Sequence, residues 1–258
     1  MKRALIVAST AGFIKGFLIH DMQLLQEMGY EVHCIANAKS IVLFKAEELF
    51  PSLGIKFHQI DFSSSSPLSK ENLNAAKQFK SLIKEYKFDF IHCHTPIVGA
   101  IVRFLAIPLS KNGCRIIYTS HGLAYPKGSS FKDKLINGGT EWICAHLCDA
   151  VITINKEDYN VMKKFGCKRV FYINGVGVDT QKYQDVTIDR NLNRKEIGVN
   201  EGNILVLSVG ELSPRKNQQI IIKALSILKD SKYVFVICGK AMVGNGTLSD
   251  TRQIIRKS

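Results

Sequence analysis

The stretch Ile204-Leu205-Val206-Leu207-Ser208-Val209-Gly210 is apolar and rich in aliphatic residues, which predicts a buried strand that ends at a glycine. A turn follows, Glu211-Leu212-Ser213-Pro214-Arg215-Lys216-Asn217, and then an apolar period that predicts a helix from about 218 to 228. A glycine lets a ligand approach the backbone, and a helix start offers N–H groups and positive potential. Cationic side chains are ordinarily unfavourable near a helix start, because they add to its positive potential. The presence of two there, Arg215 and Lys216, therefore favours a bound phosphate over charges exposed only to solvent. The candidate phosphate-binding residues are Gly210, Arg215 and Lys216.

The rest of the chain repeats this alternation of apolar strand and helix. Strands are predicted at 4–9, 31–36, 56–60, 90–93, 115–120, 150–154 and 169–173. Helices are predicted between them at 16–28, 41–50, 69–86, 97–109, 132–148 and 156–165. Such alternation is typical of an α/β fold with a mostly parallel sheet. The polar segment 184–202 lacks an apolar period, so we expect it to link a Rossmann-like domain over 1–183 to the start of a second one over 203–258.

Composition excludes a disordered chain and narrows the partners. The 258 residues are 46% hydrophobic and can bury a large core. The formal charge of +13 suits nucleic acid, an anionic membrane surface or a phosphorylated small molecule. We expect no nucleic acid, because no base-reading module is present. One predicted helix carries lysines on a single arc, at positions 70, 77, 80, 84 and 87. This arc is either a helix face exposed only to solvent or a contact surface for an anionic membrane, and both interpretations stay open.

The cysteines and apolar segments indicate a compartment. Seven cysteines at irregular spacing predict reduced thiols and a cytoplasmic protein. The first residues read as a strand, since their apolar run is too short for a signal peptide. The segment 96–109 is too short to span a bilayer and is interrupted by Arg103. Any membrane contact is therefore expected to be peripheral, on the inner face.

Loops at the carboxyl ends of parallel strands gather ligands at one edge of a sheet. Four such loops are predicted here, and their candidate cleft residues are Gly12, Lys15, Gly16, His94, His121, Gly175 and Gly177. Two open alternatives are a structural histidine at 121 and glycines at 175 and 177 that only allow a sharp turn. The two glycines of the first loop are too far apart for a dinucleotide fingerprint, which disfavours a nicotinamide enzyme.

Two histidine and cysteine trios invite comparison with metal sites. One is the run 92–94, where Cys93 would point away from the two histidines of its strand. The other is Cys144, His146 and Cys148, where the histidine would lie on a different helix face from the thiols. Neither arrangement suits tetrahedral zinc, so we expect no metal.

Several motifs together resemble one family of enzymes. They are Thr119-Ser120-His121-Gly122, Val151–Tyr159, Ile173–Asp179, and Ser208–Leu212 leading to Lys216-Asn217. The chain resembles the retaining nucleotide-sugar glycosyltransferases of family 4, whose GT-B architecture has two Rossmann-like domains. The resemblance is greatest to the branch that builds bacterial capsular or exopolysaccharide units on a lipid carrier.

This resemblance implies a reaction and roles for the candidate residues. A hexose-type sugar would pass from a nucleotide-sugar, most simply UDP-linked, to a lipid-linked or saccharide acceptor, with no metal or other cofactor. His121 would be catalytic. The donor diphosphate would be held by Gly210, Arg215 and Lys216, and the acceptor side lined by Gly12, Lys15, Gly16, His94, Gly175 and Gly177. Glu211 stands where many members carry an arginine, so the cationic role falls on the later pair.

In the family, a pair of glutamates eight positions apart lies beyond the last residue of this chain. We therefore expect a truncated donor domain and impaired activity of this chain alone. Two alternatives stay open. One is a non-catalytic acceptor-side binding module or half of a split transferase. The other is a Rossmann-type sugar-nucleotide epimerase or dehydrogenase, which would need a glycine triplet after the first strand and an acid where Asn37 stands.

Overall fold

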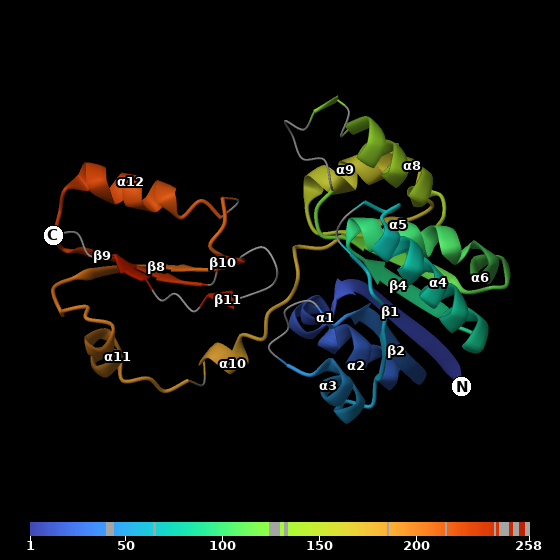
Figure 1. Ribbon diagram of the computed structural model, residues 1–258, viewed down its shortest axis with the longest axis horizontal. Helices are drawn as coiled ribbons and strands as arrows, with labels where there is room; N and C mark the ends of the chain where they lie inside the picture. The colour runs from blue at the N-terminus through green and yellow to red at the C-terminus, as the bar shows by residue number, and fades with distance from the viewer. Residues whose placement is uncertain are drawn as a thin grey trace. The chain divides into compact units, whose positions relative to one another are not determined.

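Two compact units, Met1–Val178 and Asp179–Ser258, make up the chain (Figure 1). The computed structural model describes residues 1–39, 44–63, 66–123, 130–131, 134–184, 186–214, 216–239, 241–242, 248–249 and 253–255.

A seven-stranded parallel sheet forms the centre of the first unit, with the strand order β3-β2-β1-β4-β5-β6-β7. Its strands are β1 (Lys2–Thr10), β2 (Tyr30–Asn37), β3 (Lys56–Gln59), β4 (Phe90–His94), β5 (Arg115–Ser120), β6 (Ala150–Thr153) and β7 (Val170–Tyr172). The order reverses between β1 and β4, the place in such sheets where ligands bind. The predicted α/β class is confirmed, and each predicted strand ends within two residues of the observed one.

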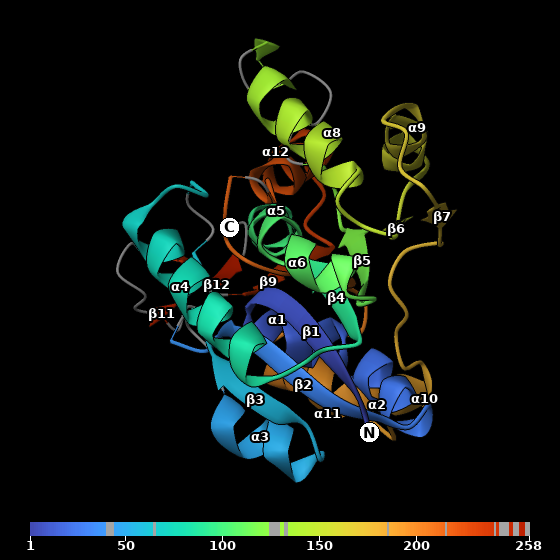
Figure 2. The ribbon, with the colours of Figure 1, turned by 90° about the vertical axis from the view of Figure 1, so that its right-hand side faces the viewer.

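Helices cover both faces of this sheet (Figure 2). They are α1 (Ala11–Phe17), α2 (Ile19–Glu27), α3 (Ala46–Ser52), α4 (Lys70–Glu85), α5 (Pro96–Leu105), α6 (Ile107–Lys111), η1 (Lys134–Gly138), α8 (Gly139–Ala145) and α9 (Lys156–Lys164). Successive side chains of β1 enter two separate cores. Ala4 and Ile6 pack with α1, α2 and α3, whereas Leu5 and Val7 pack with α4 and α5.

The predicted loop after the first strand is wrong, because α1 begins directly after β1. Thr10 Oγ1 accepts a hydrogen bond from the Phe13 N–H at 3.2 Å and so caps the helix at once. Gly12 and Gly16 are therefore helical, and both are exposed. The single helix predicted over 16–28 is two helices that meet at Leu18.

Three other predicted helices also differ from the observed ones. The helix predicted over 97–109 is divided at Ala106 into α5 and α6, with a proline in the first turn of α6. The helix predicted over 41–50 begins at Ala46 in the structure, and residues 41–43 lie outside the described part. The one predicted over 132–148 is described from Lys134 as η1 followed by α8.

A buried ion pair joins α5 to α8. Arg103 Nη2 donates to Glu141 Oε2 at 3.0 Å, and neither residue is more than 3% exposed. The guanidinium stacks 3.9 Å from the Tyr118 ring centroid, and the Tyr118 hydroxyl donates to Glu141 Oε1 at 3.3 Å. Gly99 gives this cluster room, because a Cβ there would lie 2.7 Å from the tyrosine ring. Arg103, the charged residue that interrupts the apolar segment 96–109, thus links α5 to α8 through a buried ion pair.

Replacing Glu141 by alanine should lower the free energy of unfolding by about 3–5 kcal/mol, because it leaves a buried guanidinium without its counter-charge. Urea unfolding at pH 7 measures the loss. Glu48→Ala is the matched control, since its pair with Lys45 is exposed and should contribute less than about 1 kcal/mol. Equal losses in the two variants would contradict a structural role for the buried pair.

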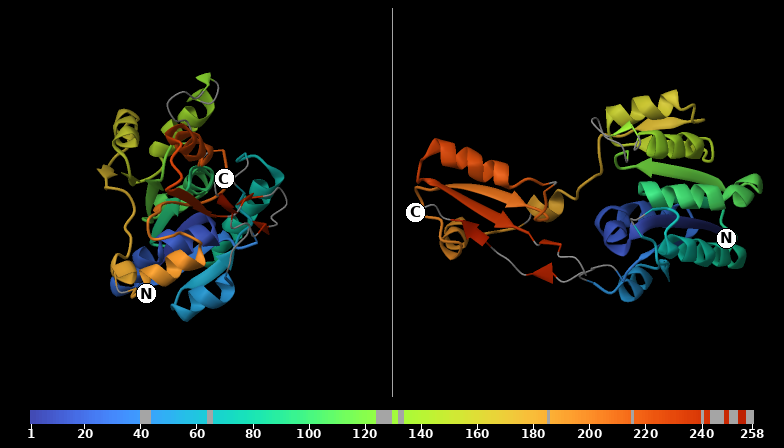
Figure 3. Two further views of the ribbon diagram at one scale, coloured as in Figure 1. Left: turned by 90° about the vertical axis from the view of Figure 1, so that its left-hand side faces the viewer. Right: turned by 45° about the horizontal axis from the view of Figure 1, so that its top comes forward.

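The second unit contains a βαβ unit of parallel strands. Its elements are α10 (Gln181–Gln184), α11 (Arg190–Glu196), β8 (Ile204–Val209), α12 (Gln219–Leu228), β9 (Tyr233–Cys238), β10 (Ala241–Met242), β11 (Leu248–Ser249) and β12 (Gln253–Ile255). β12 pairs antiparallel with β9, and α12 lies along one side of this sheet (Figure 3). α11 forms inside the predicted linker because Asp189 caps it, accepting from the N–H groups of Asn191 and Leu192.

Candidate functional site

A cavity of about 340 Å³ opens on one face of the sheet, along β4, β5 and β6. This face carries Phe90, His92 and His94 of β4. The polar lining residues of the cavity are Asp21, His92, His94, Thr119 and His121, and we call it the histidine cavity. The register explains the grouping, because His92 pairs with Ile117 and His94 with Thr119, so alternate residues of both strands share this face. Most of the remaining lining is apolar.

The structure brings together four of the predicted cleft residues and separates three. His94, His121, Gly175 and Gly177 all line the histidine cavity. The other three lie on α1, exposed, and do not line it: Gly12, Lys15 and Gly16.

Two imidazoles meet at the carboxyl ends of β4 and β5. His94 Nδ1 and His121 Nε2 are 3.1 Å apart and share a hydrogen bond. His94 is 1% exposed, and its Nε2 has no hydrogen-bond partner among the described residues. The Phe13 ring stands edge-on to His121 at 4.9 Å between centroids. His121 is thus held on two sides, and a buried imidazole nitrogen behind it is ready for a polar contact.

A third histidine extends this cluster. The ring centroid of His92 lies 4.1 Å from that of His94, and His92 Nε2 is 2.7 Å from Thr119 Oγ1. Burial lowers the pKa of His92 to about 4 and lowers the pKa of His94 well below the ordinary 6.5. Burial also lowers the pKa of His121. All three imidazoles are therefore neutral at pH 7, and each can both donate and accept a hydrogen bond.

Asp158 holds the strand end that carries His121. Its Oδ2 accepts from Ser120 Oγ and from the Leu123 N–H, each at 3.1 Å, and the carboxylate is buried. Gly122 makes the turn with a positive φ of 125°. Sequence reasoning missed this role, although a signal existed: Asn155 followed three residues later by Asp158 has the spacing of a helix N-cap box.

Asp21 is a second residue that the sequence analysis missed. It lies on α2 and lines the histidine cavity, and burial raises the pKa of its carboxyl. A carboxyl with a raised pKa in the same cavity as three imidazoles is a candidate functional residue. The sequence contains no motif for this residue, because Asp21 lies within an ordinary amphipathic helix whose buried residues are Met22 and Leu25.

In the second unit, the predicted phosphate-binding turn is close to glycine-specific. Gly210 has a φ of 153°, and Lys216 Cε lies 3.9 Å from where a Cβ on this glycine would sit. The Lys216 side chain therefore folds back along the end of β8. Ser213 Oγ in this turn is buried and has no hydrogen-bond partner among the described residues. Arg215, the other predicted cation, lies outside the described residues.

The helix begins within one residue of the predicted start. α12 starts at Gln219, so Lys216 lies in the turn that precedes it. The N–H groups of Lys216 and Asn217 donate to the Ser213 carbonyl at 3.0 and 3.2 Å. Gln218 has no side-chain cap and instead donates from Nε2 to the Glu211 carbonyl at 2.8 Å. The turn is thus closed by its own hydrogen bonds.

Among the described residues, no three His, Cys, Asp or Glu side chains are placed to hold a metal ion together. None of the helices described combines the length and apolarity that a bilayer crossing requires.

Family models match both units of the chain. The model described as Glycosyltransferase Family 4 matches residues 22–182, and the one described as Glycosyl transferases group 1 matches residues 189–254. Solved structures share the fold. Sucrose-phosphate synthase from Thermosynechococcus elongatus has a TM-score of 0.62 at 14% identity, over 92% of this chain and 62% of that one. UDP-GlcNAc 2-epimerase from Neisseria meningitidis has a TM-score of 0.58 at 13% identity, over 92% and 65%.

Curated relatives are more similar in sequence. EpsD of Bacillus subtilis (strain 168), named as a candidate glycosyltransferase, is 31% identical over 235 residues, which are 89% of this chain and 58% of EpsD. The UDP-Gal:alpha-D-GlcNAc-diphosphoundecaprenol alpha-1,3-galactosyltransferase of Escherichia coli is 26% identical over 195 residues, 68% of this chain and 49% of that one. The chain spans about half the length of these relatives. With a family model matched over most of the first unit and the expected Rossmann-like fold, the chain belongs to glycosyltransferase family 4.

Proposed function

We propose that the protein transfers a hexose-type sugar from a nucleotide-sugar to a lipid-linked or saccharide acceptor in bacterial surface polysaccharide synthesis. Family membership supplies the reaction class. The observation that carries the proposal is the hydrogen-bonded pair of neutral imidazoles, buried His94 and half-buried His121, at the carboxyl edge of the sheet. A neutral imidazole can bind a sugar hydroxyl without adding charge near a cationic transition state. The relative from Escherichia coli, whose name gives a diphosphate-lipid acceptor, supports the acceptor class.

The donor diphosphate is assigned to the turn after β8. When the bond between the sugar carbon and the diphosphate oxygen breaks, negative charge grows on the leaving group. Lys216, folded back over Gly210, and the neighbouring Arg215 would stabilise that charge. The close approach that a glycine permits supports the same assignment, as does the buried Ser213 hydroxyl.

The chemistry that we propose retains the anomeric configuration and uses no metal. The acceptor hydroxyl attacks from the face that the diphosphate leaves, and a diphosphate oxygen takes its proton as the new glycosidic bond forms. His121 would touch the transferred sugar as the catalytic residue. Gly175 and Gly177 line the same cavity. Three exposed residues of α1 that do not line it stay predicted acceptor contacts: Gly12, Lys15 and Gly16. UDP is the simplest carrier.

An anionic membrane surface is the second partner that we propose. The lysines of α4 and its C-terminal end are all exposed: Lys70, Lys77, Lys80, Lys84 and Lys87. Four of them share one arc of α4, whereas Lys87 follows the end of the helix at Glu85. This positive face would attract acidic lipids and bring the protein to a lipid-linked acceptor at the cytoplasmic side of a membrane.

A direct transfer assay tests the function. The protein should move galactose from UDP-galactose to a GlcNAc-diphosphate-lipid, or N-acetylglucosamine from UDP-N-acetylglucosamine, with retention read from the anomeric proton coupling by NMR. EDTA should leave the rate unchanged. Inversion at the anomeric carbon would contradict the proposed chemistry, and binding of both substrates without turnover would favour a non-catalytic binding module.

Lys216→Ala should lower kcat about 100-fold, because removal of one group that stabilises developing charge typically costs a factor of 10²–10³. The initial rate of UDP release measures it. Lys223→Ala is the control, since this exposed lysine lies on α12 outside the turn and should change the rate less than twofold. If both variants lose activity equally, the diphosphate does not bind at Gly210 and Lys216.

Acid should destabilise the protein through the histidine cavity. An unfolded imidazole takes a proton near pH 6.5, whereas His92 resists it until about pH 4 when folded. The free energy of unfolding should therefore be highest above pH 6.5 and fall between pH 6.5 and 4. In His92→Gln this fall should be smaller, by up to about 3 kcal/mol, since one pKa unit corresponds to about 1.4 kcal/mol.

Urea unfolding at pH 7.5 and 4.5 provides this comparison, and only the difference between the two pH values is scored. His146→Gln, which removes an exposed imidazole outside the histidine cavity, serves as the control and should keep the wild-type difference. A His92→Gln difference equal to that of wild type would contradict a neutral buried histidine.

A further inference from the structure

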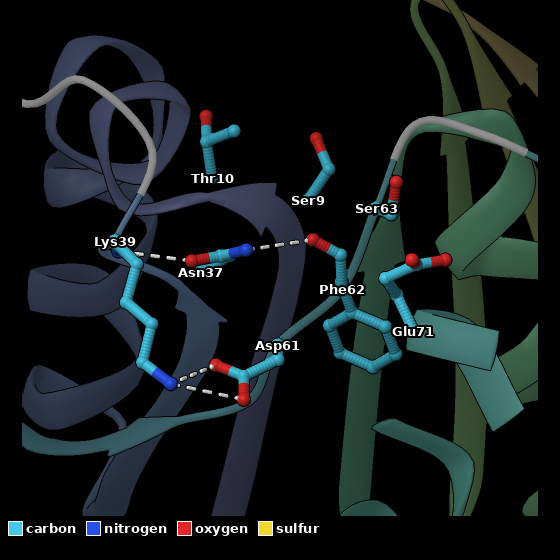
Figure 4. Close-up of a pocket in the computed structure, with 8 residues that line it drawn as sticks. All are labelled: Ser9, Thr10, Asn37, Lys39, Asp61, Phe62, Ser63 and Glu71. Carbon is cyan, nitrogen blue, oxygen red and sulfur yellow. Dashed lines mark hydrogen bonds and ion pairs between the residues drawn. The ribbon is translucent and has the colours of Figure 1, made fainter. Parts of the chain in front are cut away.

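A second cavity, of about 370 Å³, lies at the carboxyl ends of β1, β2 and β3 in the first unit (Figure 4). None of the residues predicted from the sequence as site residues lines it. Figure 4 shows Ser9 and Thr10 at the end of β1, between Asn37 and Lys39 on one side and Phe62 and its neighbours on the other. We call it the β1–β3 cavity.

One wall of this cavity is fixed by an ion pair and amide hydrogen bonds. Lys39 Nζ lies 2.9 Å from Asp61 Oδ1 and 3.0 Å from Oδ2. Gln59 Nε2 donates to the same carboxylate at 2.8 Å, and Asn37 Nδ2 donates to the Phe62 carbonyl at 2.9 Å. These contacts join the segments that follow β2 and β3 and hold polar groups in place before any ligand arrives, which lowers the entropic cost of binding.

The opposite wall offers hydroxyls and a carboxylate. Thr10 Oγ1 accepts from the Phe13 N–H, so its O–H proton is directed elsewhere, and Ser9 stands beside it. The Glu71 carboxylate also lines the cavity, and its own backbone N–H, followed by the Ser69 hydroxyl, holds its pKa below the usual range. Glu71 is therefore ionised at neutral pH and can only accept hydrogen bonds.

The balance of charge selects the ligand. The described lining contains one cation, Lys39, against two carboxylates, Asp61 and Glu71, and the cation is already paired. A phosphate would meet net negative charge here, whereas a neutral molecule with several hydroxyls would find carboxylate acceptors and hydroxyl donors together. The volume lies at the lower end of the range for small-ligand pockets, about 300–1,000 Å³, and suits one or two sugar rings.

We propose that the β1–β3 cavity binds an uncharged saccharide through Asp61, Glu71 and the hydroxyls of Ser9 and Thr10. The identification of this saccharide as part of the acceptor rests on the proposed glycosyl transfer. The phosphate groups of both substrates are bound elsewhere, because this cavity lacks an unpaired cation among its described lining residues.

Saturation-transfer NMR on the full chain tests the proposal with methyl N-acetyl-α-glucosaminide and methyl α-galactoside as neutral probes and inorganic pyrophosphate as competitor. At least one glycoside should bind, and pyrophosphate should not displace it. Glu71→Gln and Asp61→Asn should each weaken the dissociation constant about tenfold or more. Glu47→Gln, an exposed carboxylate on α3 outside the cavity, should leave it unchanged.

Because Asp61→Asn also breaks the pair with Lys39, Ser9→Ala provides a second variant that leaves the pair intact, and it should weaken binding about threefold. The proposal is overturned if neither glycoside binds, if pyrophosphate competes, or if Glu71→Gln and Ser9→Ala bind as wild type does. A chain that binds the glycoside through these residues but transfers no sugar would contradict the proposed function alone. Transfer with an acceptor KM that these variants leave unchanged would contradict this inference alone.

Discussion

The alternation of side chains along β1 is the constraint on which the first unit depends. Ala4 and Ile6 face one helical layer, Leu5 and Val7 face the other, and both sets are completely buried. Because the sheet is parallel and in register, this choice also decides the faces of its neighbours, so His92, opposite Ile6, shares the α2 face. A slip of β4 by one residue would turn His92 and His94 toward the opposite core. The position of the functional chemistry is therefore fixed by hydrophobic packing.

Burial on that face then determines what the imidazoles can do. Burial removes water that would stabilise the charged form of a histidine, and it lowers the pKa of both His94, which is fully buried, and His121, which is half-buried. Both therefore act as neutral hydrogen-bonding groups at pH 7. Asp158 contributes at a distance, since it binds the backbone and hydroxyl of the turn instead of an imidazole. Asp158 therefore fixes the turn that carries His121.

Local patterns predicted much of this, and contacts distant in sequence explain the rest. The strands were predictable because each is a short run of aliphatic residues in the sequence. The contact of His94 with His121 was expected because the carboxyl ends of parallel strands lie at the same edge of the sheet. The contact of Asp158 with Ser120 spans 38 residues and has no periodic signature. The start of α1 was not predicted, because Gly12 and Gly16 suggested a loop. In the structure the Thr10 hydroxyl caps a helix that begins directly after β1.

The two cavities of the first unit and the turn of the second differ in charge, and in the proposed function this difference would divide the substrates among them. Sugar hydroxyl groups would meet neutral imidazoles in one cavity and carboxylates in the other, where Lys39 is neutralised by Asp61. A phosphate is best bound by cations or free N–H groups, and Lys216 lies over a glycine that would let a ligand approach the backbone. Under this proposal, recognition of the sugar and recognition of the phosphate depend on different residues, so a substitution can change the specificity for one and leave the binding of the other unchanged.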